Sequence, residues 1–195
     1  MVAFTNLGTF QIPETPAQLE SEPVIVEFSQ AEPISTVEYY AGYGEAKLEF
    51  YYSEDGVTYA PVVLEKSGTT LSEIEHKFAN MYKWQIYTTG VDAKYIKIVP
   101  LSGSLPILEV AFKDAQGNLL EPQNITPSSA QVLFDEQNLV PEESTYMTDF
   151  YFDEIYHVRT AYENIHGIEP YEITHPPLGK DVYKRQHGMR SGNYC

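Results

Sequence analysis

Alternation of apolar and other residues in several stretches between positions 24 and 113 constrains the fold of this chain more than any other feature. In the stretch 47–52, Leu48, Phe50 and Tyr52 lie at every second position, and the stretch 107–112 repeats the pattern. A two-residue period places alternate side chains on opposite faces of a β-strand. About eight short strands of this kind, separated by turn signals, precede residue 145, and no convincing helix does. The sequence therefore predicts a mainly β fold, an antiparallel β-sandwich.

Several short motifs in this region, taken in order, resemble those of discoidin or galactose-binding-like jelly rolls. They are YYSEDGVTY, the lone Trp84 within a strand, KYIKIVP and LEVAFKD, all within residues 20–120. The resemblance implies a jelly-roll-like, galactose-binding-like sandwich, which we place at residues 1–122. Modules of this kind often bind carbohydrate, and many only pack against a neighbouring domain.

Tyrosine is abundant, with 16 residues. Aromatic rings stack on the apolar faces of sugars, but tyrosine also suits a half-buried strand surface, so both interpretations stay open. The candidate sugar-binding aromatics are Tyr39, Tyr40, Tyr43, Tyr51, Tyr52, Tyr59, Tyr82, Trp84 and Tyr87.

The charge of the chain is strongly acidic, with 28 Asp and Glu against 12 Lys and Arg and a net charge of −16. Nucleic-acid binding is disfavoured, because phosphate contacts need clustered basic residues and none cluster before the last residues. No stretch approaches the roughly 18 to 20 consecutive apolar residues that a spanning helix needs. A single cysteine, Cys195, excludes a disulfide within the chain.

Residues 123–144 are rich in Pro, Ser and Glu around the apolar patch Val132–Phe134. This composition predicts a linker that packs through the patch. Residues 145–180 follow, and they hold most of the chemistry that the sequence offers.

An amphipathic helix is predicted after residue 148. Thr148 or Asp149 can cap its start, apolar residues recur at three- and four-residue spacing, and Gly167 is placed to end it. Asp153 and His157 lie one turn apart on its polar side, so an acid–histidine pair can form.

The Phe-Asp-Glu sequence at 152–154, the short helix, and the sequence His-Pro-Pro-Leu at 175–178 before Lys180 resemble the first extracytoplasmic loop of the protein O-mannosyltransferases. These are GT-C enzymes of the membrane, which transfer a sugar from a polyprenyl-phosphate carrier. The resemblance implies that the chain is the extracytoplasmic fragment of a cell-membrane glycosyltransferase, inactive alone, whose transmembrane helices lie outside it. The implied donor is a polyprenyl-phosphate-linked sugar, mannose by the resemblance, and the acceptor is a protein or glycan hydroxyl.

Site residues follow from the same resemblance. Asp153 matches the family's catalytic base, and the adjacent Glu154 would orient the donor or acceptor in an inverting transfer. Among substrate-binding candidates, His175 would shape the loop beside the donor and Lys180 would approach the carrier phosphate; we add His157 because it can pair with Asp153. No metal and no cofactor are implied.

The last residues, 181–195, begin with DVYKRQ and resemble the translated read-through of a sequencing adapter. We expect the native sequence to end near Lys180, although an ordinary basic tail is the alternative.

Two other functions remain open. A stand-alone carbohydrate-binding or adhesion module would need only the β-sandwich. A soluble metal-dependent hydrolase would use His157, His166, His175 and Asp153, but their spacing matches no compact zinc pattern.

Overall fold

The computed structural model describes residues 11–19, 22–143 and 154–169. It divides into two compact units, residues 1–149 and 150–195.

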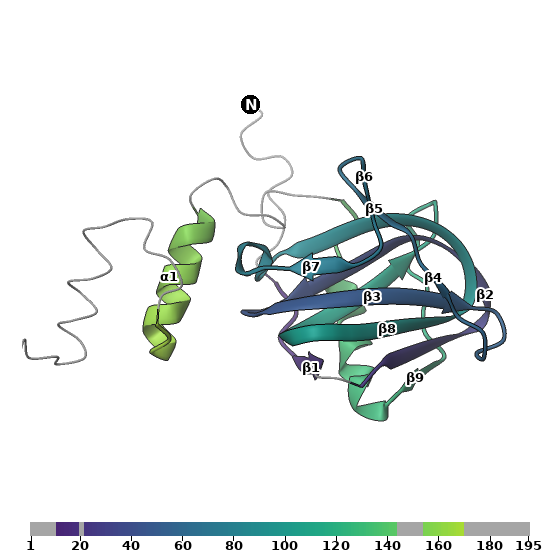
Figure 1. The fold of residues 1–195 in the computed structure, drawn as a ribbon, viewed down its shortest axis with the longest axis horizontal. Helices are drawn as coiled ribbons and strands as arrows, with labels where there is room; N and C mark the ends of the chain where they lie inside the picture. The colour runs from purple at the N-terminus through teal and green to yellow at the C-terminus, as the bar shows by residue number, and fades with distance from the viewer. Residues whose placement is uncertain (1–10, 20–21, 144–153, 170–195) are drawn as a thin grey trace, which may run out of the picture. The chain divides into compact units, whose positions relative to one another are not determined.

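Two long strands, β2 (Val24–Ala41) and β8 (Trp84–Lys113), organise the first unit (Figure 1). The first part of β2 pairs with the middle of β8, from Val24 opposite Ile98 to Glu27 opposite Tyr95. The partner numbers fall along β8 as they rise along β2, which is antiparallel pairing. The second part of β2, residues 36–40, pairs on one side with residues 84–88 and on the other with residues 109–113. Both strands therefore contribute to two layers.

The first layer contains β3 (Glu45–Ser53), the middle of β8, the start of β2, and β9 (Asn124–Thr126). The short strands β4 (Ala60–Pro61) and β7 (Ile74–His76) pair with the free edge of β3.

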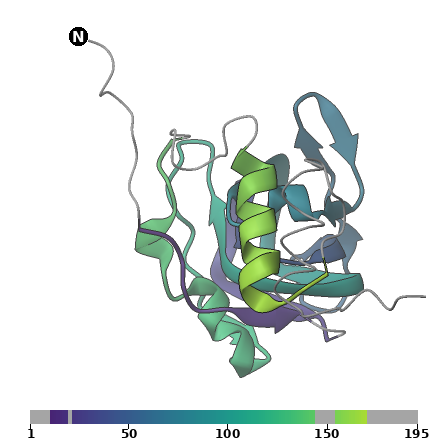
Figure 2. The same ribbon diagram turned by 90° about the vertical axis from the view of Figure 1, so that its left-hand side faces the viewer.

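The second layer contains the two ends of β8 with the second part of β2 between them. On one edge, β1 (Ala17–Leu19) pairs with residues 105–107. On the other edge, β5 (Leu64–Lys66) bridges to Thr88 and forms a hairpin with β6 (Thr69–Leu71), which extends beyond the layers in Figures 1 and 2.

Every second residue of these strands enters one apolar core between the layers. Phe28 from the first layer meets Phe112 from the second edge-on, with ring centroids 5.8 Å apart. Each fully buried side chain of this size contributes about 1.5–3 kcal/mol. Other core members include Val24, Val26, Val37, Tyr39, Leu48, Phe50, Ile74, Ile96, Ile98, Leu105, Ile107, Val110 and Leu133. The predicted mainly β, sandwich-type fold is confirmed.

The sequences SEDG at 53–56 and DAQGN at 114–118 predict two turns, and both are present. Asp55 Oδ1 accepts hydrogen bonds from the backbone N–H groups of Val57 and Thr58, each 2.8 Å long, and Gly56 takes φ +72°. Asp114 closes the other turn by accepting the N–H of Asn118 at 2.8 Å. The polar composition of residues 66–79 predicts a loop, or one helical turn around residues 72–76. The structure instead has strands β6 and β7 there, and β7 forms because His76 and its neighbours pair with residues 46–48 of β3.

The segment 123–144, predicted as a linker, contributes to the sandwich in the part that the structure describes. Strand β9 extends the first layer, and the 3₁₀ helix η2 (Ser128–Phe134) places Leu133 in the core. Phe134 stacks on Phe112 at 6.1 Å, so the predicted apolar patch packs as expected. The short 3₁₀ helices η1 (Phe78–Asn80) and η3 (Gln137–Leu139) complete this unit.

The second unit holds α1 (Glu154–His166). Gly167 ends it as predicted, with φ +66°. Ile168 N–H donates to Glu163 O at 2.8 Å and Gly167 N–H to Asn164 O, which is a Schellman ending. The predicted caps Thr148 and Asp149 lie outside the described residues. No helix within the described ranges is long and apolar enough to cross a membrane.

Candidate functional site

The outer face of the first layer carries the most promising group of side chains. Phe50, Ile96 and Ile98 point into the core, so the residues next to each of them on the same strand point outward. We call the following set the tyrosine–lysine face: Tyr51, Tyr59, Tyr95, Lys97, Glu27 and Glu49. All six are partly exposed.

Tyr51 is tied to its own strand. Its hydroxyl donates to Glu49 Oε2 at 2.6 Å, two residues earlier on β3. This hydrogen bond is the main reason that the pKa of Tyr51 lies above its usual value. With its hydroxyl held at Glu49, the Tyr51 ring keeps one orientation along the strand.

Tyr95 is fixed from two sides. Its hydroxyl donates to Glu27 Oε1 on β2, 2.9 Å away. Its ring packs against Gly56 so closely that a Cβ there would lie 3.2 Å from Tyr95 Cζ. The Asp55 turn holds Gly56 in place; hydrogen bonds, first from Thr58 N–H, lower the pKa of Asp55. A local turn signal thus positions a ring on the neighbouring strand.

Lys97 is a neighbour of both rings. It is the direct cross-strand partner of Tyr51 on β3 and of Ile25 on β2. Its Nζ lies 4.4 Å from the centroid of the Tyr59 ring, a cation–π contact that holds the ammonium over this face.

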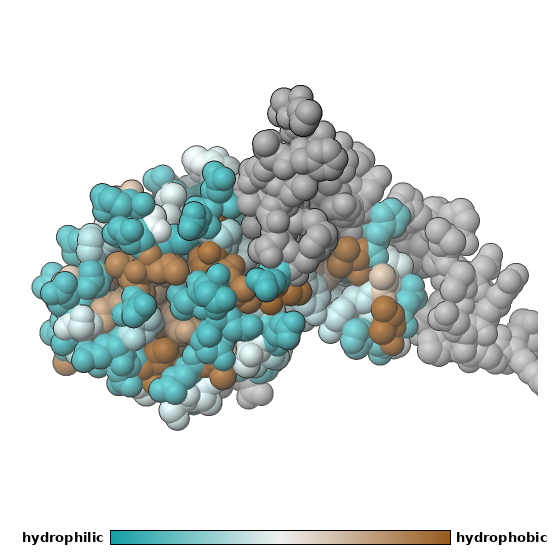
Figure 3. All heavy atoms as spheres, turned by 180° about the vertical axis from the view of Figure 1, so that it is seen from behind, coloured by the Kyte–Doolittle hydropathy of each residue, from teal (hydrophilic) through white to brown (hydrophobic). Residues whose placement is uncertain are grey.

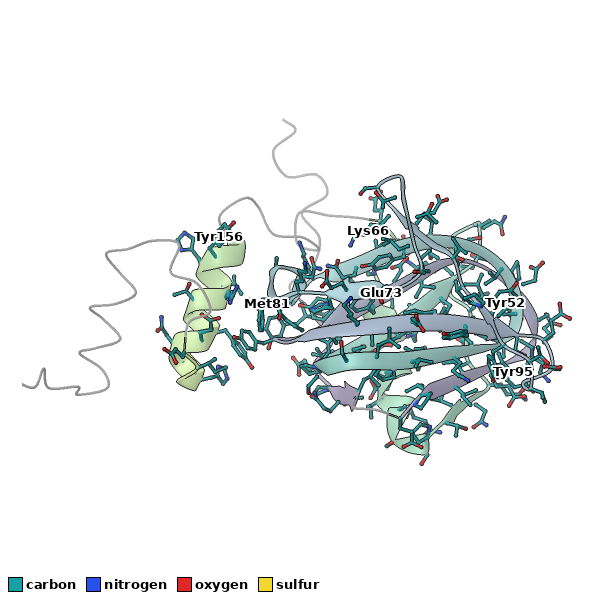
Figure 4. All side chains as sticks on the ribbon, viewed as in Figure 1. Tyr52, Lys66, Glu73, Met81, Tyr95 and Tyr156 are labelled. Carbon is teal, nitrogen blue, oxygen red and sulfur yellow. The ribbon has the colours of Figure 1, made fainter. Side chains whose placement is uncertain are left out.

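A pocket of about 500 Å³ adjoins this face at the edge where β4 and β5 begin. Pro61 belongs both to its wall and to the pair with Tyr51. Figure 4 shows Tyr52, another wall residue, near the same end of the layer as Tyr95. Thr89 Oγ1 donates to Val63 O at 2.9 Å across the wall. The other lining residues are Glu65, Thr88, Gly90 and Val91.

A polar cluster inside the sandwich is closed to ligands. His76 is fully buried, its Nδ1 lies 3.1 Å from Tyr39 Oη, and its Nε2 has no partner among the described residues. Burial, assisted by the charges of Lys66 and Lys83, lowers the pKa of His76 to about 4, so the ring is neutral at pH 7.

Three carboxylates, Glu109, Asp135 and Glu136, have oxygens within 4.8 Å of one another. Protein donors already engage two of them. Glu109 accepts the N–H of Glu136 at 3.1 Å and the side-chain amide of Gln137, and Glu136 Oε2 accepts the N–H of Glu14 at 2.8 Å. Burial raises the pKa of Glu109 to about 8. This acidic group therefore has a structural explanation, and no histidine joins it within the described ranges.

The residues predicted for glycosyl transfer are only partly described. Asp153, His175 and Lys180 lie outside the described residues. Glu154 is the first residue of α1, and His157 is exposed three residues later. His166, a member of the hypothetical metal set, lies at the end of α1 with Nδ1 2.9 Å from Tyr162 O. The catalytic assignment stays a prediction.

The predicted list of sugar-binding aromatics includes residues that are buried in the structure and omits one that belongs to the tyrosine–lysine face. Tyr39, Tyr40 and Tyr87 are buried, whereas Tyr51 and Tyr59 belong to the face. The list lacked Tyr95 and gave no weight to the cation Lys97. Alternation within KYIKIVP is the signal that could have found both, since Ile96 and Ile98 mark the inward positions.

Neither a scan of protein-family models nor a search of curated proteins gives a match. Among solved structures, the chain is similar to a pectin-binding carbohydrate-binding module, with 21% identity and a TM-score of 0.41. That alignment covers 56% of this chain and 78% of the module. A TM-score this low leaves the fold assignment to the strand register described above.

Proposed function

We propose that the β-sandwich is a carbohydrate-binding module, without catalysis, whose ligand lies on the tyrosine–lysine face. The observation that carries this proposal is the fixing of two rings, Tyr51 and Tyr95, by Glu49 and Glu27 next to Lys97. Rings held in place lose little conformational entropy when a sugar stacks on them.

The polar groups of the face suit the same ligand. A pyranose offers an apolar ring face for stacking and hydroxyls around its rim for hydrogen bonds. Glu27 and Glu49 each have acceptor capacity beyond the one tyrosine hydroxyl that they accept. The adjoining pocket, at about 500 Å³, is within the size range of small-molecule sites.

Binding to soluble glycans tests the proposal. The full chain is screened against neutral and acidic oligosaccharides, and the affinity for the best ligand is measured by calorimetry. Tyr51→Ala and Tyr95→Ala should each weaken binding about tenfold, equal to about 1.4 kcal/mol. Tyr156→Ala, which removes an exposed tyrosine from α1, is the matched control and should leave affinity unchanged. Equal affinities for all three variants would refute the site.

The second candidate function is the membrane glycosyltransferase. The specific observation in its favour is local: the region of the motif contains a helix, α1, which ends at Gly167 as the sequence predicts. In this proposal Asp153 is the base, Glu154 orients a substrate, and His175 and Lys180 lie near the polyprenyl-phosphate donor at the extracytoplasmic face of the membrane. The parent gene should encode an apolar run of about 20 residues soon after Lys180. With that protein in hand, Asp153→Asn should abolish sugar transfer; an active variant would remove Asp153 as the base.

A further inference from the structure

We infer that the tyrosine–lysine face selects acidic sugars, with Lys97 binding a uronate carboxylate. This inference rests on the proposed function and adds the class of ligand.

Lys97 differs from the other lysines of the first layer in having no carboxylate partner. Lys47 Nζ lies 2.6 Å from Glu73 Oε1. Lys94 Nζ lies 3.5 Å from Glu27 Oε1. Across the described ranges, no carboxylate lies within 4.0 Å of Lys97 Nζ, whose contact is the Tyr59 ring.

The nearby carboxylates are held away from Lys97. Glu49 accepts the Tyr51 hydroxyl, and Glu27 accepts the Tyr95 hydroxyl and the ammonium of Lys94. Two of the three rings of the face, Tyr51 and Tyr95, are thus fixed by carboxylates, while the neighbouring cation Lys97 keeps its donors for a ligand. An ammonium carries three N–H donors, and a ring π-face engages only part of them.

The position of Lys97 suits a sugar that stacks on either ring. Directly opposite residues of antiparallel strands have Cβ atoms about 4.5–5.5 Å apart, which is the relation of Lys97 to Tyr51. Tyr95 is two residues away on the same face of β8. A carboxylate that projects from the rim of a stacked pyranose therefore meets Lys97 from both stacking positions.

The net charge of −16 does not prevent this contact. At physiological ionic strength the Debye length is about 8 Å, so distant acids are largely screened while a direct ion pair is not. The overall charge should slow the approach of a polyanion, and the local cation should decide which sugar stays bound.

The test compares one uronic-acid oligosaccharide with its methyl ester, which has the same backbone and no charge. The full chain should bind the acid about tenfold more tightly than the ester. Lys97→Gln should abolish this preference, whereas Lys97→Arg should retain it. Lys77→Gln, which removes the same charge from an exposed lysine, is the control and should preserve the preference.

The outcomes separate the two proposals. Equal affinity for acid and ester, both weakened by Tyr51→Ala, would overturn the inference and leave carbohydrate binding intact. Retention of the preference in Lys97→Gln would also overturn it. Failure of both oligosaccharides and of the neutral glycans to bind would overturn the proposed function itself.

Discussion

The two outer faces of the sandwich are built from the same alternation of residues, yet their charged side chains differ in exposure to solvent. On the first layer, charged side chains are partly exposed; Lys47 and Glu73, for example, are 40% and 39% exposed. On the second layer, outward positions hold Glu38, Glu109 and Lys113, all buried.

A covering segment explains the difference. Residues 136–141 lie against the outer face of the second layer, where Lys113 Nζ donates to Pro141 O at 2.7 Å and Glu136 N–H donates to Glu109. Lys113 also pairs with Glu38 at 3.0 Å. Figure 3, a view from behind, shows apolar side chains among the polar ones on the described part of the sandwich. Ile86, an outward residue of the second layer, is 37% exposed. The comparison teaches that outward charges become structural where a segment covers them and remain available to a ligand where none does.

Removal of a buried cation should give the largest effect. Lys113→Met leaves Glu38 buried without its partner, and breaking a buried pair in this way costs about 3–5 kcal/mol. The free energy of unfolding, measured by urea denaturation, should fall by that amount. Lys97→Met, on the exposed tyrosine–lysine face, is the control and should lower the free energy of unfolding by less than about 1 kcal/mol. Equal losses in the two variants would erase the distinction between the faces.

The pH dependence of Glu109 comes next. Burial raises the pKa of Glu109 to about 8 in the folded state, from its ordinary value of 4.5. The folded state therefore binds the Glu109 proton more tightly than the unfolded state does. The resulting contribution to the free energy of unfolding is fully present below pH 4.5 and is lost as the pH rises through 8. Between pH 5 and pH 8 the loss is ~3 kcal/mol.

Comparison with Glu109→Gln isolates this effect. His76 acts in the opposite direction, because its lowered pKa makes stability fall as the pH drops from 6.5 through 4. The difference in unfolding free energy between wild type and Glu109→Gln, followed from pH 5 to pH 8, cancels the contribution of His76. A difference that stays constant over this range would show that Glu109 is ionised in the fold.

The smallest effect on stability is expected on the tyrosine–lysine face. Glu27→Gln weakens the hydrogen bond that holds Tyr95 and removes the ion pair with Lys94, and exposed pairs contribute about 0–1 kcal/mol. Unfolding should change little, whereas glycan affinity should fall about threefold because the Tyr95 ring is less well fixed. Calorimetry can measure both the stability and the glycan affinity of this variant. A large loss of stability would show that Glu27 has a structural role, like the buried charges on the outer face of the second layer.

Local signals in the sequence predicted the strands and turns. Alternation at 47–52 and 95–99 depends on neighbouring residues only, and the Asp55 and Asp114 turns use hydrogen bonds over two to four positions. The covering segment could not be predicted in the same way, since its contacts join residues about 27 positions apart, such as Glu109 and Glu136. Strand β7 escaped prediction because its three residues are set by pairing with β3.

The candidate site was only partly predictable for a related reason. Alternation separates outward tyrosines from buried ones, but only the register shows that Lys97 stands opposite Tyr51 and that Tyr95 reaches Glu27. The motif-based residues Asp153, His175 and Lys180 depend on the resemblance alone, and their test lies with the parent gene.

Titration of the ¹⁵N-labelled full chain with a uronic-acid oligosaccharide, followed by NMR, tests the central claim most directly. Binding at the tyrosine–lysine face should shift the amide signals of Tyr51, Tyr95 and Lys97 and leave those of Glu38, Glu109 and Lys113 unchanged. Shifts confined to the outer face of the second layer or to α1 would contradict the account.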